Sequence, residues 1–156
     1  MRFTHAVRYD APVAEVHTML TDAAFREKAS WSQGVESVEV QVDGSTVRIE
    51  MVQPNTDIPS FARAFAGETT RAIQTEHWAD DLSADFSVAT PGKPAGIHGI
   101  RRLVADGDGT LDTFEGEAKA KIPLIGGKIE SLIKDKLVQG WDQESVVGAA
   151  WLAGER

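Results

Sequence analysis

The chain has 156 residues, of which 42% are hydrophobic, and it carries a formal net charge of −8 with no cysteine. This length suits a single domain over residues 1–156 with a buried core. The absence of cysteine excludes disulfides, thiol nucleophiles and cysteine-ligated metals. The acidic charge disfavours binding to nucleic acid, and no apolar run is long enough for a membrane-spanning helix. We therefore expect a cytoplasmic protein that does not insert stably into a membrane.

The N-terminal segment predicts one strand followed by two short helices. Residues 2–9 alternate between apolar and polar side chains, which is typical of a half-buried strand and not of a signal peptide. Pro12 suits the first turn of a helix, because a proline there loses no helical hydrogen bond. Asp22 suits the cap of a second helix that runs past Phe25.

The middle of the chain has the period-two pattern of antiparallel strands. Residues 35–52 alternate on both sides of Asp43-Gly44, which is a strong hairpin signal. Residues 53–67 contain two prolines and predict an irregular segment with one short turn of helix. Further strands are expected over residues 68–78, 82–89, 97–105 and 111–121.

The C-terminal segment, residues 122–152, has the period of a helix. Pro123 is expected in its first turn, and the polar Glu144 is expected off its apolar face. A helix of about 30 residues would be roughly 45 Å long, so the rest of a small domain must wrap around it. The apolar face comprises Ile129, Leu132, Ile133, Leu137, Trp141, Val147, Gly148 and Trp151.

The strand before this helix has conspicuously small residues on one face. Gly116, Ala118 and Ala120 alternate with polar residues and leave room for a bulky neighbour, which we expect to be the long helix. The sequence therefore predicts an α+β fold of one strand, two short helices, six strands and one long helix. In this fold a curved antiparallel sheet of about seven strands wraps around the C-terminal helix.

This order of elements resembles the helix-grip fold of the START-like superfamily, which includes polyketide cyclases, proteins of the birch-pollen-allergen type and coenzyme-Q-binding proteins. YDAPVAEVHTML resembles the family's passage from strand to helix, and TDAAFREKASW resembles its second helix. IPLIGGKIESLIKDKL resembles the start of the grip helix in bacterial members. His17 stands where the family usually has an aromatic residue such as tryptophan. The whole chain is also similar to an actinobacterial subfamily of uncharacterised function.

The resemblance implies a cavity between sheet and helix that holds a hydrophobic small molecule, such as a lipid, a quinone or a polyketide-like compound. The alternative is that the same side chains pack against one another as core and leave little space. The candidate lining residues are Phe25, Trp31, Val38, Val40, Ile49, Met51, Phe61, Phe65, Ile73, Phe86, Phe114, Ile133, Leu137 and Trp141.

A second interpretation is an enzyme of the cyclase or hydrolase type, which needs an ionisable side chain inside the cavity. The candidates are His5, Glu76, Asp85 and Arg101. Glu76 and Asp85 are expected to be cross-strand neighbours, with one of them buried near Arg71 or Arg101. The chain lacks metal, nucleotide and nucleophile-elbow motifs, so no metal and no cofactor is expected.

A third interpretation is an interaction module. An exposed surface formed by Trp141 and Trp151, or by Phe61 and Phe65, would then form a homodimer or contact a membrane. Light scattering and co-sedimentation with liposomes would distinguish such a module from a monomeric protein that binds a small molecule.

Overall fold

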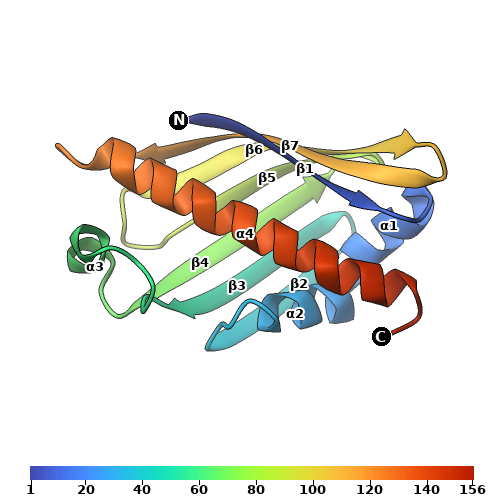
Figure 1. Ribbon diagram of the computed structural model, residues 1–156, viewed down its shortest axis with the longest axis horizontal. Helices are drawn as coiled ribbons and strands as arrows, with labels where there is room; N and C mark the ends of the chain where they lie inside the picture. Colours follow the sequence, from blue (N-terminus) through green and yellow to red (C-terminus); the bar gives the residue numbers. More distant parts are fainter.

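The computed structural model describes residues 1–156, and its centre is a seven-stranded antiparallel sheet with the order β1-β7-β6-β5-β4-β3-β2. The strands curve around the last helix, which crosses their concave face diagonally (Figure 1). The elements are β1 (Arg2–Tyr9), α1 (Val13–Leu20), α2 (Ala23–Trp31), β2 (Ser37–Asp43), β3 (Thr46–Pro54), α3 (Ser60–Ala66), β4 (Thr69–Trp78), β5 (Ser83–Ala89), β6 (Ala95–Asp106), β7 (Gly109–Ala120) and α4 (Gly126–Leu152). This arrangement confirms the α+β helix-grip prediction.

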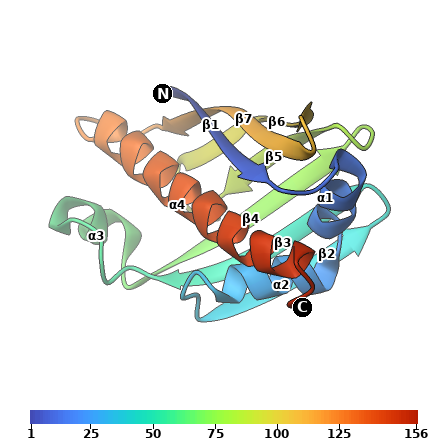
Figure 2. The ribbon, with the colours of Figure 1, turned by 45° about the vertical axis from the view of Figure 1, so that its right-hand side comes forward.

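The chain places its first and last strands side by side. Six consecutive strands form a meander from β2 to β7, and β1 adds to the outer edge of β7 in an antiparallel register from Arg2 opposite Glu117 to Tyr9 opposite Thr110. The helices α1 and α2 lie at the end of the sheet near the C-terminus of α4, whereas α3 lies toward the N-terminal half of α4 (Figure 2). None of the helices combines the length and the apolar content that a membrane crossing requires.

Local sequence signals account for several boundaries. The Asp22 carboxylate accepts hydrogen bonds from the backbone N–H groups of Ala24 (2.8 Å) and Phe25 (3.3 Å), so it caps α2 as predicted. Asp43 pairs with Thr46 across the β2–β3 turn, where Gly44 has a φ of 58°. A glycine adopts this left-handed conformation without a steric penalty, which explains why the Asp-Gly pair marks the hairpin.

The predicted start of the long helix is wrong by four residues. The helix begins at Gly126 and not near Pro123, and it has 27 residues. Leu124, which lies between them, has a φ of 71° and a fully exposed side chain. A left-handed residue interrupts a right-handed helix, so residues 122–125 form a turn before α4.

The buried apolar residues form three clusters along α4. The largest joins α1, α2 and the C-terminal end of α4, and it includes Leu20, Phe25 and Trp151. The second is aromatic: the Phe114 and Trp141 rings are stacked with centroids 3.6 Å apart. The third lies beside α3 and contains Ile58, Ala62, Ala120 and Ile129.

The small residues of β7 fulfil the predicted role in part. Ala118 packs in the cluster that contains Trp141, and Ala120 packs in the cluster that contains Ile129, so both lie against α4 as expected. Gly116 instead lies beneath the Phe3 and Phe86 rings, which a Cβ atom at this position would approach to 2.8 Å and 3.2 Å. The bulky neighbours on this face are therefore aromatic side chains of the sheet as well as the helix.

Replacing Gly99 with alanine is expected to lower the free energy of unfolding by about 3 kcal/mol, the upper end for overpacked sites. A Cβ at Gly99 would lie 2.1 Å from the Glu115 carbonyl oxygen and 2.7 Å from the Gly116 Cα, and neither backbone atom can move without breaking the β6–β7 pairing. Urea unfolding followed by circular dichroism measures the effect.

The matched control for this prediction is Gly127→Ala in α4, where a Cβ meets no atom within 4 Å. That variant should be more stable than the wild type by about 0.5–1 kcal/mol, because alanine favours a helix over glycine. Equal unfolding midpoints for the Gly99→Ala variant and the wild type would contradict the close approach of these strands.

Candidate functional site

A pocket of about 580 Å³ lies between α4, α3 and the strands from β3 to β6. This volume falls within the range of about 300–1,000 Å³ that is usual for small-molecule sites. Side chains from the N-terminal half of α4 form one wall, and the segment from β3 through α3 forms the opposite side. The larger apolar lining residues are Met51, Ile58, Phe65, Val88, Ile97, Ile129, Leu132, Ile133, Leu137 and Trp141.

The polar lining of the pocket differs between its rim and its interior. At the rim, Lys136 of α4 forms an ion pair with Asp57 at 2.6 Å. In the interior, the Gln74 side chain is only 8% exposed and makes no hydrogen bond within the chain. Glu144 also lines the pocket, from the same helix as Lys136 but two turns further along.

The candidate cavity residues are distributed between the pocket and the core. Met51, Phe65, Ile133, Leu137 and Trp141 line the pocket. The others lie outside it. Phe25 and Ile49 belong to the largest core cluster, Val38 and Val40 pack against that cluster, and Phe86 and Phe114 belong to the aromatic cluster. Phe61 packs against the α3 cluster, Ile73 is half-buried between the inward-facing Ala72 and Gln74, and the Trp31 side chain is exposed.

The position of α2 explains why so many of these residues are core. This helix packs on β2 and on α4, so the part of the sheet formed by β2 and the adjoining end of β3 is covered by protein. The open space is therefore confined to the opposite end, beside α3. Of the candidates Phe25, Trp31, Phe61 and Phe65, only Phe65 therefore lines the pocket.

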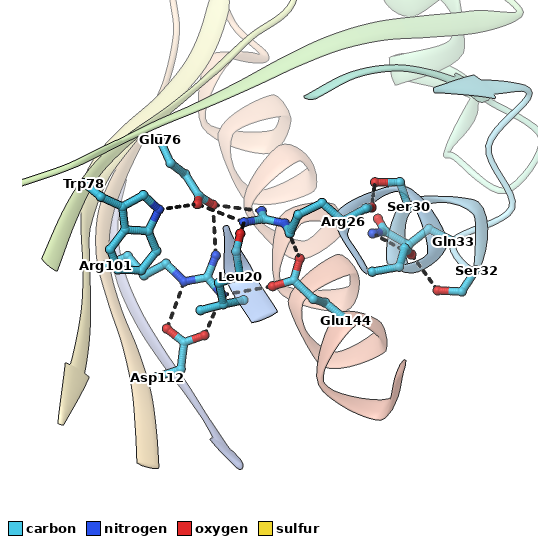
Figure 3. Close-up of polar contacts among 11 residues, drawn as sticks. Leu20, Arg26, Ser30, Ser32, Gln33, Glu76, Trp78, Arg101, Asp112 and Glu144 are labelled. Carbon is cyan, nitrogen blue, oxygen red and sulfur yellow. Dashed lines mark hydrogen bonds and ion pairs between the residues drawn. The ribbon is translucent and has the colours of Figure 1, made fainter. Parts of the chain in front are cut away.

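The interior end of the pocket borders a buried network of five charged side chains (Figure 3). The members come from five different elements, and none is more than 6% exposed. They are Arg26 of α2, Glu76 of β4, Arg101 of β6, Asp112 of β7 and Glu144 of α4. Buried charges persist only when they are paired and hydrogen-bonded, and here the pairing joins the helices to the sheet.

Arg26 binds Glu76 with two parallel hydrogen bonds, from Nη1 to Oε1 (2.9 Å) and from Nη2 to Oε2 (2.8 Å). Its Nη1 also donates to the Leu20 carbonyl (3.0 Å), and its Nε lies 3.4 Å from Glu144 Oε2. Glu76 receives a further hydrogen bond from the Trp78 indole at 3.2 Å. This bidentate geometry is the strongest form of arginine–carboxylate pairing.

Arg101 contacts all three carboxylates of the network. Its Nε and Nη2 bind the two oxygens of Asp112 at 2.9 Å and 2.5 Å, its Nη1 binds Glu76 Oε2 at 2.9 Å, and its Nη2 also binds Glu144 Oε1 at 2.9 Å. The Phe114 ring covers the guanidinium at 4.8 Å from the ring centroid. Arg101 is therefore the central cation of the network.

The network has unequal charges, because two guanidinium groups face three carboxylates. Burial disfavours the charged form of Glu76, but both arginines outweigh this cost and lower its pKa to about 2. Burial and the neighbouring Glu144 and Glu76 carboxylates raise the pKa of Asp112 to about 6, although Arg101 opposes the shift. Arg101 contacts three carboxylates, and each of them stabilises the positive charge of its guanidinium. Asp112 contacts only one guanidinium, so its ionised form is less well stabilised.

Tyr9 adds an unusual polar group beside the network. Its hydroxyl is buried and has no hydrogen-bond partner. Burial raises the pKa of Tyr9 strongly, and the Glu144 and Asp112 carboxylates add to the shift. The side chain therefore remains neutral at physiological pH.

The enzyme interpretation identified two members of the network. Glu76 is buried beside Arg101 as expected, but it stands opposite Phe86 and not Asp85, which pairs with His77 and is exposed. Arg71 is exposed and binds Glu50 at 2.9 Å. His5 lies outside the network, with its Nε2 2.7 Å from the Asp142 carboxylate.

The sequence did not identify Arg26, Asp112 or Glu144 as members. The burial of Asp112 could have been predicted, because this residue lies two positions before the inward-facing Phe114 and therefore on the same face of β7. Glu144 was expected off the apolar face of α4, but it is 6% exposed because α2 covers the helix on that side. The interaction module loses the first of its two candidate surfaces, since Trp141 and Trp151 are 3% and 7% exposed and cannot form a surface patch, whereas Phe61 and Phe65 are half-buried.

Comparison with solved structures shows that the fold is shared widely. The chain is similar to TTHA0849 from Thermus thermophilus, with a TM-score of 0.68 and 19% identity over 99% of both chains. It is similar to the di-domain ARO/CYC StfQ from the steffimycin biosynthetic pathway, with a TM-score of 0.65 and 13% identity over 96% of this chain and 49% of StfQ. It is also similar to Ara h 8.0201, with a TM-score of 0.60 and 14% identity over 94% and 97% of the two chains.

These likenesses, at low identity, are likenesses of fold, and they agree with the helix-grip arrangement that the sequence predicts. No curated protein matches the sequence of the chain. One family model matches residues 4–152, which is nearly the whole chain. The protein therefore belongs to the family described as "Protein of unknown function (DUF2505)".

Proposed function

We propose that the protein binds a small molecule with a large apolar part in the pocket between α4 and the sheet. The observation that carries this proposal is the combination of volume and lining: about 580 Å³, walled by Ile133, Leu137 and other aliphatic side chains of α4 and the sheet. A lipid, a quinone or a polyketide-like compound has the required apolar body. A ligand that buries about 200 Å² of apolar surface would gain about 5 kcal/mol before ordering costs.

The binding unit in this proposal is a monomer in the cytoplasm. A single chain supplies all of the pocket lining, so a second copy is not needed to complete the site. The absence of cysteine is consistent with a reducing compartment. Light scattering with and without ligand tests whether a homodimer forms instead.

Replacing Leu137 with tryptophan is expected to weaken binding of a neutral apolar fluorophore, N-phenyl-1-naphthylamine, at least about tenfold, or about 1.4 kcal/mol. Leu137 lines the pocket from α4, and an indole in its place fills space that the probe would occupy. Fluorescence titration of the purified protein measures the dissociation constant.

The matched control is Val146→Trp on the same helix, because the Val146 side chain is 63% exposed and does not line the pocket. This variant should bind the probe as the wild type does. If both variants bind the probe equally well, the pocket is not the binding site.

Catalysis is a second candidate function, because one buried carboxylate, Glu144, reaches the lining of the same pocket. Native mass spectrometry of protein purified without added ligand distinguishes the two roles. A co-purifying compound that is released with its mass unchanged after incubation supports binding alone. A compound that the protein converts to a new mass supports an enzyme of the cyclase or hydrolase type.

A further inference from the structure

Glu144, which lines the pocket, carries the least well satisfied carboxylate of the buried network. Glu144 Oε1 accepts one hydrogen bond from Arg101 at 2.9 Å, and Oε2 has only the longer 3.4 Å contact with Arg26. Glu76, in comparison, accepts hydrogen bonds from Arg26, Arg101 and Trp78. An ionised carboxylate has about four acceptor sites, so Glu144 retains capacity for another donor.

Two further polar groups near this end of the pocket have no partner within the protein. The indole Nε1 of Trp141 is buried without a hydrogen bond, and Trp141 lines the pocket. The Gln74 amide lies on the same face of β4 as Glu76 and lines the pocket, and it makes no hydrogen bond within the protein. Buried polar groups are normally paired, and each unpaired one needs an explanation. The side-chain oxygen of Gln74 can accept a hydrogen bond from a donor on a bound ligand, whereas the indole N–H of Trp141 is itself a donor and requires an acceptor.

The charges of the network define what that donor should be. Arg26 and Arg101 face Glu76, Asp112 and Glu144, so the fully ionised network carries one negative charge without a balancing cation. An uncompensated buried charge costs several kcal/mol, which the protein can avoid by binding a proton or a cation. The raised pKa of Asp112 shows that the network tends to take a proton.

We propose that the pocket selects an amphiphilic amine, whose ammonium group pairs with Glu144 at the interior end while its apolar body lies along the α4 side chains. This inference rests on the proposed function. One added positive charge would bring the network to neutrality. A carboxylate at the same position would double the excess negative charge of the network and would be excluded. An acid could instead be held at the rim by Lys93 and Lys136, which also line the pocket.

The test compares three probes that share one alkyl chain: dodecylamine, dodecanol and dodecanoate, each displacing N-phenyl-1-naphthylamine at pH 7 and below its micellar concentration. The wild type should bind dodecylamine at least about tenfold more tightly than dodecanoate. In the Glu144→Gln variant this preference should fall to less than about threefold, while binding of dodecanol stays within about threefold of the wild type.

The matched control is Asp135→Asn, which removes an exposed carboxylate of the same helix that does not line the pocket and changes the net charge by the same amount. It should leave the preference for the amine in place. Equal binding of amine and acid by the wild type would overturn the proposal, and this comparison needs no variant to fold. The proposal also fails if Asp135→Asn abolishes the preference as fully as Glu144→Gln does.

The design separates this inference from the proposed function. Displacement by dodecanol without a preference for the amine would leave the apolar pocket supported and the ammonium site refuted. If none of the three probes displaces the fluorophore, the proposed function fails, and the inference fails with it.

Discussion

Replacing Arg101 with methionine is expected to lower the free energy of unfolding at pH 7 by about 3–5 kcal/mol, the usual cost of removing one partner from a buried ion pair. Arg101 is fully buried and contacts three carboxylates, so its loss leaves Glu76, Asp112 and Glu144 with Arg26 as their single cation. Methionine fills a similar volume, which limits any cavity contribution. Urea unfolding monitored by circular dichroism measures the change.

The neighbouring residue provides a control on the same strand. Arg102 forms an ion pair with Glu115 at 3.2 Å, and both side chains are about half exposed or more. Arg102→Met should therefore change the free energy of unfolding by less than about 1 kcal/mol, as for other surface pairs. Similar destabilisation in both variants would contradict the special role of the buried network.

A double variant tests whether excess negative charge is the cause. Adding Asp112→Asn to the Arg101→Met variant removes one of the three stranded carboxylates, so it should recover about 1 kcal/mol or more of the lost stability. Strictly additive destabilisation would instead mean that the loss arises from packing around Phe114, whose ring contacts the guanidinium.

The fold was predictable because its signals are local. Asp43-Gly44 requires a left-handed glycine at a tight hairpin, and the alternation over residues 2–9 requires one buried face, so each pattern has one structural outcome. The start of α4 was missed because Pro123 is compatible with a helix but does not require one. The left-handed Leu124 has no recognisable sequence signal.

The site was less predictable because its burial comes from elements far apart in the sequence. Glu144 is buried because α2 covers one side of α4 while the sheet covers the other, and the helical pattern of α4 alone records only one apolar face. Arg26 lies in a short helix whose sequence gives no reason to bury a guanidinium. Glu76 and Arg101 could be suggested from strand alternation, but their partners depend on tertiary packing.

The same lack of tertiary information explains the candidate cavity residues. Strand alternation identifies which side chains face inward, and Ile49 and Met51 do so equally. Both belong to the core cluster that includes the buried residues of α2, but only Met51, which is nearer the end of β3 that leads to α3, also lines the pocket. The boundary between core and pocket is therefore set by where the helices lie, which the strand pattern does not encode.

The two shifted carboxyl groups give the stability of the protein an unusual dependence on pH. Glu76 has a lowered pKa of about 2, so it stabilises the fold above its unfolded pKa, and this contribution is lost as the pH falls toward 2. Asp112 has a raised pKa of about 6, so the folded state holds its proton where the unfolded state has released it. The stabilisation of the fold by Asp112 is present below about pH 4 and is lost as the pH rises through 6.

We expect that the free energy of unfolding of the wild type falls by about 3 kcal/mol between pH 4 and pH 7 relative to the Asp112→Asn variant, which has no proton to lose at this position. Urea titrations of both proteins at unit intervals of pH measure this difference. Asparagine keeps one oxygen for the Arg101 Nε, so it resembles the protonated acid that the wild type carries at pH 5.

An exposed carboxylate on the same strand provides the comparison. Glu115→Gln removes a side chain that is 66% exposed, and this variant should keep the wild-type decline from pH 4 to pH 7. Parallel profiles for the wild type and Asp112→Asn would mean that Asp112 ionises in the folded state as readily as in the unfolded state. Arg101 would then outweigh the burial of Asp112.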